Sequence, residues 1–191
     1  MTPEPIDPKA LAAVDLGSNS FHAVVAREEE GRPRVIDKVR ERVALAEGLH
    51  GGRLDALVQA RALATLERIG ERLAAVPLAR VRAVGTATFR KLRDGEAFLR
   101  TASKALGTPI EILPGREEAR LVYLGVAHAL GDDEGERLVV DIGGGSTECM
   151  LGTRFESQSE DSLTMGCVPW SRRIFPGGHM HSGAFEEAAL A

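Results

Sequence analysis

The chain has 191 residues, of which 43% are hydrophobic, and its formal net charge at pH 7 is −4. This content is sufficient for the core of one large domain, or of one domain and part of another. The negative charge and the 4% of aromatic residues argue against binding to nucleic acid, which relies on cationic and stacking surfaces. Any phosphate-rich substrate must therefore be held by local cations and a metal ion.

No segment approaches the roughly 20 apolar residues that a membrane span requires, and residues 1–9 lack the apolar stretch of a signal peptide. We therefore expect a cytoplasmic protein. Two cysteines, Cys149 and Cys167, are too few and too far apart for a disulfide framework or a zinc site. We expect both to be structural.

The first part of the chain predicts a short sheet followed by helices and strands in alternation. Residues 1–9 contain three prolines and two acids, which is typical of a flexible leader. Apolar runs then predict an antiparallel meander of strands over residues 11–16, 21–26 and 33–43. Apolar residues at steps of three and four predict a helix over 54–75 that Pro77 ends. The elements that follow are strand 81–84, helix 96–106, strand 110–113 and helix 116–130.

The last of these helices and the segment after it set the expected domain organisation. Its predicted buried stripe consists of Ala119, Val122, Val126 and Ala129. The polar segment 131–136 predicts a linker, so a first lobe should span 10–134 and a second part 135–191. In the second part we expect strands over 138–140, 149–152 and 163–165, a polar loop between the last two, and a helix that begins at residue 184 with no stop signal.

A glycine-rich motif, LVVDIGGGSTE, spans Leu138 to Glu148. It predicts a buried strand that runs into Asp141 and then into three consecutive glycines. Glycines allow positive φ and a close approach of backbone N–H groups to a phosphate, and Asp141 could hold a metal ion beside it. The alternative is a tight β-hairpin in which the glycines only satisfy the turn and Asp141 caps it.

A shorter copy of this motif occurs near the start of the chain. Asp15, Leu16 and Gly17 follow an apolar run, as Asp141, Ile142 and Gly143 do later. The shared element is short, so chance is an alternative to common origin. We interpret the pair as two related lobes, each offering a phosphate loop to a cleft between them.

Charged residues beyond two predicted strands are further candidates. Arg90, Lys91 and Arg93 follow strand 81–84, at the end where open α/β sheets bind their ligands, although a solvated face is the favoured interpretation for Lys91 and Arg93. Glu117 and Glu118 fall in the first turn of helix 116–130. They either complement the helix dipole, or one of them orients and deprotonates an attacking water.

Five segments together resemble the exopolyphosphatase and guanosine pentaphosphate phosphohydrolase family, which is part of the superfamily of actin-like, Hsp70-like and sugar-kinase-like ATPase folds. In chain order they read VDLGSNSFH, VGTATFRK, ILPGREEARLVYLGV, LVVDIGGGSTE and SLTMGCVPWSRRIFPGG. The resemblance implies an α/β fold, with a ribonuclease H-like lobe followed by the start of a second, truncated lobe of the same type. It also implies a hydrolase that releases terminal phosphate with a divalent metal, in the first instance Mg²⁺.

The resemblance also implies roles for single residues. Glu118 would be the general base, Arg90 would contact phosphate, Asp141 would bind the metal, and Glu148 would lie near the metal through water. The residues that would bind phosphate are Asp15, Gly17, Ser18, Asn19, Gly143, Gly144, Gly145 and Ser146. Hydrolysis would then depend on positioning and on neutralisation of the charge that spreads over the phosphoryl oxygens.

The chain departs from the family in length, because the second lobe lacks its later strands and helices. Apolar faces that these would cover should be exposed. Three functions stay open: a phosphoanhydride hydrolase, a kinase or ATPase on the same loops, and a binding module without turnover. The sequence does not choose between inorganic polyphosphate and guanosine pentaphosphate as substrate, nor between monomer and homodimer.

Overall fold

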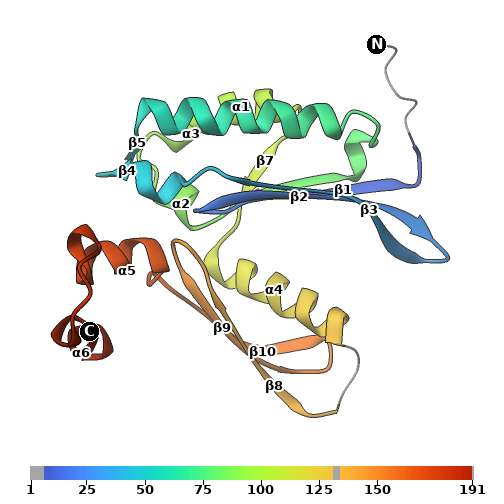
Figure 1. The fold of residues 1–191 in the computed structure, drawn as a ribbon. Coiled ribbons are helices and arrows are strands. Elements are labelled where there is room, and N and C mark those ends of the chain that lie inside the picture. Colours follow the sequence, from blue (N-terminus) through green and yellow to red (C-terminus); the bar gives the residue numbers. More distant parts are fainter. Residues whose placement is uncertain (1–6, 131–133, 191) are drawn as a thin grey trace. The chain divides into compact units, whose positions relative to one another are not determined.

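The computed structural model describes residues 7–130 and 134–190, and the chain divides into two compact units (Figure 1). Unit 1 ends at Leu113 and unit 2 begins at Pro114. Each unit has its own sheet and its own hydrophobic core. Among the described residues, no helix is both long enough and apolar enough to cross a membrane.

The sheet of unit 1 combines an antiparallel meander with two parallel strands. Strands β1 (Ala10–Leu16), β2 (Ser20–Glu29) and β3 (Arg32–Arg42) form the predicted meander, and β6 (Val81–Gly85) and β7 (Ile110–Ile112) extend it in the order β3-β2-β1-β6-β7. Alternate residues of β1 are buried, which is the period expected when helices cover one face of a sheet.

Helices α1 (Ala56–Arg72) and α3 (Gly95–Leu106) cover that face (Figure 1). Their apolar residues meet β1 and β2 in a core in which Phe21, Leu66 and Ile69 are fully buried. A Cβ on Gly70 would lie 2.6 Å from the carbonyl oxygen of Leu106, so glycine allows the two helices to pack closely.

Helix α1 ends before Pro77, and short elements complete unit 1. The short elements are the 3₁₀ turns η1 (Leu45–Gly48) and η2 (Leu78–Arg80), the hairpin β4 (Leu49–His50) and β5 (Arg53–Leu54), and the single helical turn α2 (Ala87–Arg90).

Unit 2 is a three-stranded antiparallel sheet with one helix packed against it. Strands β8 (Glu136–Ile142), β9 (Thr147–Thr153) and β10 (Glu156–Leu163) lie in the order β10-β9-β8, and α4 (Gly115–Leu130) packs against them. Helix α5 (Cys167–Ile174), the 3₁₀ turn η3 (Pro176–Gly178) and helix α6 (Ser182–Leu190) follow.

The boundary between the units differs from the predicted one, because α4 belongs to unit 2. Its buried stripe consists of Ala119, Tyr123 and Ala127, which share a core with Met150 of β9. Of the predicted stripe, Ala119 is buried and Val122 packs against this core, whereas the prediction was wrong for Ala129, which is exposed. Tyr123 sets the register, because its ring fills the space beside Gly152, where a Cβ would lie 2.6 Å from it.

The polar loop expected between residues 152 and 163 is strand β10. Its sequence, ESQSEDSL, has no apolar alternation and therefore predicted a loop, and this prediction was wrong. The strand forms because its backbone pairs with β9 at the edge of the sheet, where polar side chains can stay in water.

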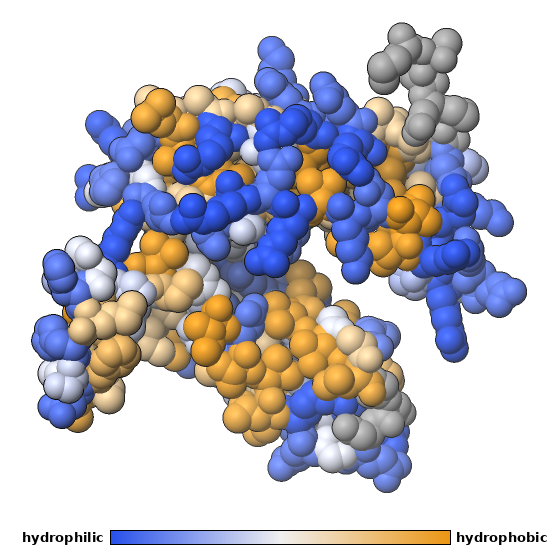
Figure 2. Space-filling model, viewed as in Figure 1, coloured by the Kyte–Doolittle hydropathy of each residue, from blue (hydrophilic) through white to orange (hydrophobic). Residues whose placement is uncertain are grey.

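Strand β8 exposes an apolar face that the sequence predicted to be buried. Leu138, Val140 and Ile142 are 68%, 50% and 70% exposed. The strand register places Leu151 of β9 and Leu163 of β10, each about 40% exposed, on the same face, opposite α4. Figure 2 shows hydrophobic side chains gathered over these strands. The expected exposed apolar face is therefore present.

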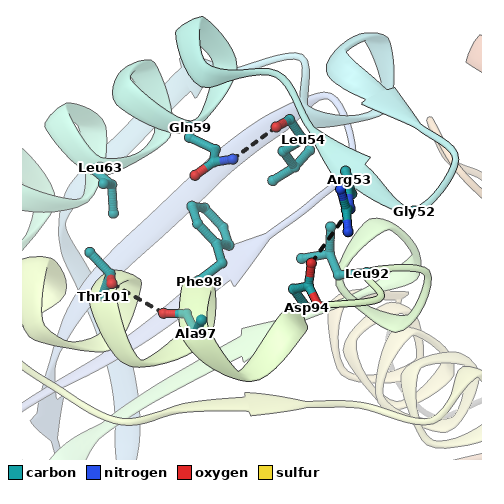
Figure 3. Close-up of a pocket in the computed structure, with 10 residues that line it drawn as sticks. All are labelled: Gly52, Arg53, Leu54, Gln59, Leu63, Leu92, Asp94, Ala97, Phe98 and Thr101. Atoms are coloured by element: carbon teal, nitrogen blue, oxygen red, sulfur yellow. Dashed lines mark hydrogen bonds and ion pairs between the residues drawn. The ribbon is translucent and has the colours of Figure 1, made fainter.

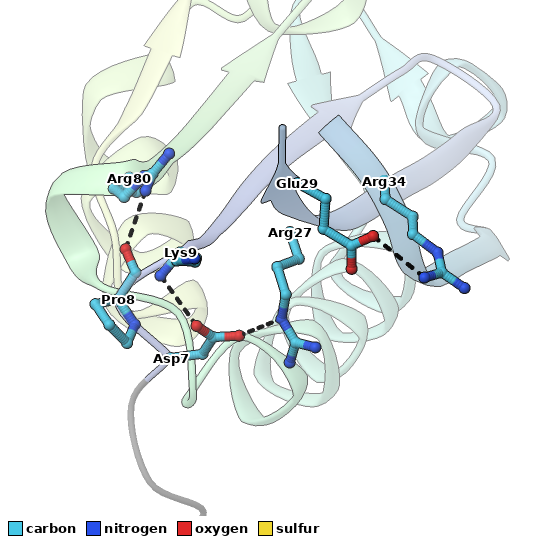
Figure 4. Close-up of polar contacts among 7 residues, drawn as sticks. All are labelled: Asp7, Pro8, Lys9, Arg27, Glu29, Arg34 and Arg80. Carbon is cyan, nitrogen blue, oxygen red and sulfur yellow. Dashed lines mark hydrogen bonds and ion pairs between the residues drawn. The ribbon is translucent and has the colours of Figure 1, made fainter. Parts of the chain in front are cut away.

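The last three residues of the predicted leader are attached to unit 1, whereas residues 1–6 lie outside the described part of the chain. The Asp7 carboxylate accepts hydrogen bonds from the backbone N–H of Lys9 (3.0 Å) and from Nε of Arg27 (2.6 Å), and Arg80 donates to the Pro8 carbonyl (Figure 4). The Lys9 N–H and the Arg27 guanidinium hold the pKa of Asp7 below its usual range. The prediction of a flexible leader was wrong for Asp7, Pro8 and Lys9.

Candidate functional site

The two strand-Asp-x-Gly motifs form hairpins of identical register, one in each unit. Leu16 pairs with Phe21 across residues 17–20, and Ile142 pairs with Thr147 across residues 143–146. In both loops the first glycine approaches the last carbonyl. A Cβ on Gly17 would lie 2.9 Å from the oxygen of Ser20, and one on Gly143 would lie 3.1 Å from that of Ser146. This shared geometry supports the internal repeat.

The glycine turn of unit 2 adopts ordinary backbone angles, which corrects one expectation. None of Gly143, Gly144 and Gly145 is among the residues with positive φ. The hairpin alternative therefore describes the local structure correctly. Gly166 packs closely against this turn, since a Cβ on Gly166 would lie only 2.5 Å from the backbone of Gly145.

The start of helix α5 fixes this turn. The N–H groups of Cys167 and Val168 donate to the carbonyls of Gly143 (3.0 Å) and Gly144 (3.1 Å). In a trans peptide the N–H points opposite to the carbonyl. The amides of Gly144 and Gly145 are thus directed away from α5. The hydroxyl of Thr147 also donates to the Met165 carbonyl.

Helix α4 places Glu118 at the same end of unit 2 as the glycine turn. The His128 and Phe155 rings lie 4.8 Å apart, and the Tyr123 hydroxyl donates to the Arg154 carbonyl (3.3 Å). The C-terminal half of α4 thus lies at the β9–β10 turn. Its first turn, which carries Glu118, points toward the opposite end of β9, where the glycine turn ends.

Asp141 and Glu148 are direct partners in the strand register at this end. The Glu148 side chain is almost fully buried and accepts a hydrogen bond of 2.8 Å from the Ser162 hydroxyl, while Asp141 is half-buried. No group of three or more His, Cys, Asp or Glu side chains within residues 7–130 and 134–190 is arranged to hold a metal ion. Two carboxylates still fit Mg²⁺, because it usually takes one or two carboxylates together with substrate phosphates and water.

The two glutamates at the start of α4 have different surroundings. Arg120 forms a two-pronged ion pair with Glu117 (2.9 and 2.8 Å), which lowers the pKa of Glu117. Glu118 is half-buried, and its own N–H donates to the Pro114 carbonyl (3.0 Å). Glu117 is thus paired with Arg120, while the role of Glu118 as the general base stays a prediction of the family resemblance.

In unit 1 the loop 17–20 and the segment that carries Arg90 meet at one end of the sheet. Leu16 and Gly85 are register partners at the ends of parallel strands, so the loops after them meet. The Thr88 hydroxyl donates to that of Ser18 (2.8 Å), and both side chains are buried. Sequence reasoning did not single out Thr88, although it lies two residues before Arg90.

Arg90 is held by the neighbouring strand end, whereas Asp15 lies on the outer face of its strand. Nη1 of Arg90 donates to the Leu113 carbonyl at 2.9 Å, and its side chain is half-buried. Lys91, Arg93 and Asp15 are exposed. Unit 1 thus gathers Ser18 and Arg90 of the predicted phosphate contacts at the carboxyl ends of its strands, and unit 2 gathers Glu118, Asp141, Glu148 and the glycine turn at one end of its sheet.

A separate cavity of about 460 Å³ lies between α1, α3 and the β4–β5 hairpin (Figure 3). Leu63 and Phe98 line it, and the Arg53 and Asp94 side chains form an ion pair at its rim (3.5 Å). None of the predicted site residues lines this cavity. It is therefore distinct from the candidate site.

Comparison with known families identifies the family of the chain. A model of the Ppx/GppA phosphatase family matches residues 24–190. The chain belongs to this family. The resemblance drawn from the five segments is therefore confirmed.

Solved structures of family members are similar over almost the whole chain. An exopolyphosphatase from Cytophaga hutchinsonii is 27% identical, with a TM-score of 0.80, over 90% of this chain and 54% of that one. The Ppx/GppA family member from Aquifex aeolicus is 28% identical, with a TM-score of 0.76, over 95% of this chain and 58% of that one. This chain therefore spans little more than half the length of these structures.

More distant structures share the fold alone. The ethanolamine utilization protein EutJ from Carboxydothermus hydrogenoformans is 21% identical, with a TM-score of 0.53, over 98% of this chain and 62% of that one. The expected α/β class, that of the actin-like ATPase fold, is confirmed by these matches together with those to exopolyphosphatases.

Proposed function

We propose that this chain carries the residues of a metal-dependent phosphoanhydride hydrolase that releases terminal orthophosphate from inorganic polyphosphate. The observation that carries the proposal is in unit 2. There the first turn of α4, with Glu118, points to the end of the sheet that holds the glycine turn and the Asp141–Glu148 pair. A general base, an anion cradle and a pair of carboxylates at one end are the parts that phosphoryl transfer to water requires.

In the proposed reaction the oxygen of a water molecule attacks the terminal phosphorus. The bond between that phosphorus and the bridging oxygen breaks, and the oxygen leaves on the shortened chain. Glu118 orients the water and takes its proton. The amides of Gly144 and Gly145 neutralise charge on the phosphoryl oxygens. Arg90, which the Leu113 carbonyl orients, contacts phosphate as the family resemblance implies.

Asp141 and Glu148 would hold the divalent metal, for which we propose Mg²⁺. When bound, the ion would supply charge neutralisation at the phosphate oxygens. Two carboxylates on facing strand positions offer hard oxygen ligands, which suit this ion. The burial of Glu148 and its bond to the Ser162 hydroxyl favour a fixed side chain.

The first experiment measures orthophosphate release from long-chain polyphosphate, with and without Mg²⁺, by the chain, by Glu118→Gln and by Glu117→Gln. The two substitutions remove the same charge from adjacent residues. We expect metal-dependent release that falls at least about 100-fold in Glu118→Gln, because a general base contributes about 10²- to 10⁴-fold. Glu117→Gln should retain most of the activity, since its carboxylate is paired with Arg120.

Equal losses in the two variants would contradict the assignment of Glu118. Absence of release by the folded wild-type chain would refute hydrolysis by this chain and favour a binding module. The same assay with guanosine pentaphosphate tests the second substrate of the family resemblance. Release of orthophosphate from that nucleotide but not from polyphosphate would make guanosine pentaphosphate the proposed substrate.

A further inference from the structure

Four cations lie along helix α3 and the segment before it. Among them, only Arg90 is a predicted catalytic residue. We define this cationic row as Arg90, Arg93, Arg100 and Lys104. All four line two depressions of about 660 and 470 Å³, which adjoin because both contain Leu99 and Arg100. Arg93, Arg100 and Lys104 are exposed, and Arg100 and Lys104 lie four positions apart on one face of the helix.

The local charge is opposite to that of the chain. Four cations line the two depressions, against two acids, Asp94 and Glu96, whereas the whole chain carries −4. Asp94 is paired with Arg53 on the side of the separate cavity (Figure 3). Glu96 contacts Arg100 at 3.5 Å and is 94% exposed, so water screens this pair strongly. The row therefore presents a positive surface with an extended outline.

The lining favours a bare phosphate chain over a nucleotide. The aromatic residue of this lining, Phe89, is 2% exposed, and its ring packs against Phe98 at 5.9 Å between centroids. It therefore offers no open face on which a base could stack. Guanidinium and ammonium groups bind phosphate oxygens without any need for a base.

We propose that the cationic row binds successive phosphates of a linear inorganic polyphosphate chain. The inference rests on the proposed function for its ligand class, and it extends the phosphate contacts from Arg90 along α3 to Lys104. A long polyanion gains a contact at each cation it reaches, whereas a short one engages only part of the row. The row thus favours long chains over short ones.

The test measures equilibrium binding of long-chain polyphosphate and of tripolyphosphate to the wild-type chain and to the double variant Arg100→Gln, Lys104→Gln. Glutamine keeps helix propensity, so the variant should melt at the wild-type temperature. The matched control is Arg32→Gln, Arg34→Gln, which removes two charges from the start of β3, outside the two depressions. Binding is measured at several salt concentrations without turnover.

We expect the α3 variant to bind long-chain polyphosphate about tenfold more weakly, with the slope of log affinity against log salt reduced by about one to two. Binding of tripolyphosphate, and of guanosine pentaphosphate as a third ligand, should change less than about twofold, as should all binding by the control. Equal weakening by the control would show a general charge effect and overturn the proposal. So would unchanged binding by the α3 variant, or a wild-type chain that does not bind long-chain polyphosphate.

The two proposals fail separately. Loss of long-chain binding in the α3 variant with no orthophosphate release by the wild type would support the row and refute hydrolysis. Release that depends on Glu118, together with unchanged long-chain binding in the α3 variant, would support hydrolysis and refute the row.

Discussion

At the scale of single residues, the hydrogen bond from the Thr88 hydroxyl to the Ser18 hydroxyl joins the segment before Arg90 to the loop 17–20 of unit 1. Both side chains are buried, so Thr88→Val keeps the shape but leaves the Ser18 hydroxyl without this donor. We expect unit 1 to lose about 1–2 kcal/mol in its free energy of unfolding, measured by urea denaturation. Thr101→Val is the control, because Thr101 is exposed and its hydroxyl donates to the Ala97 carbonyl within α3. Equal effects of the two substitutions would contradict a special role for the Thr88–Ser18 bond.

At the scale of elements, the docking of α5 on the glycine turn depends on Gly166. A Cβ at this position would lie 2.5 Å from the Gly145 backbone, so Gly166→Ala should displace α5 and cost about 2 kcal/mol or more. Trp170, the single tryptophan of the chain, lies on α5, and its fluorescence during urea denaturation reports the change. Gly125→Ala on α4 has open space around it and should stabilise by up to about 1 kcal/mol. A Gly166→Ala variant with wild-type fluorescence and midpoint would refute the contact.

Ion pairs between strand β3 and helix α1 make another element-level contact depend on pH. Arg72 lowers the pKa of Asp37, and Arg68 lowers that of Glu41. A carboxylate whose pKa is lower in the folded state contributes stability above its unfolded pKa and loses it as pH falls through the folded pKa. The melting temperature of wild type should therefore fall more steeply than that of Arg68→Gln, Arg72→Gln as pH drops from about 5 to 3. Parallel pH profiles would exclude this contribution.

The sequence predicted most elements of the fold but not the packing between them. The meander and both hairpins follow from local signals, because an apolar run that ends in Asp-x-Gly limits what the backbone can do. The sequence could not predict which face of β8 is buried, since LVV is apolar on both faces and has no period. Strand β10 has no apolar signal, and it forms because its backbone pairs with β9. The position of α4 depends on Tyr123 and Gly152, a pair that no local pattern connects.

At the scale of the whole molecule, the exposed face of β8 should govern association more than stability. Leu138 and Ile142 are 68% and 70% exposed, so Leu138→Thr, Ile142→Thr removes apolar surface that water already contacts, while threonine keeps strand propensity. We expect light scattering of concentrated samples to decrease, with a change in urea midpoint smaller than that of the control Val139→Thr, which packs against α4. A large loss of stability in the double variant would show that this face is covered in solution. In that case the loss should depend on protein concentration, because a face buried between copies of the chain is stabilised by mass action.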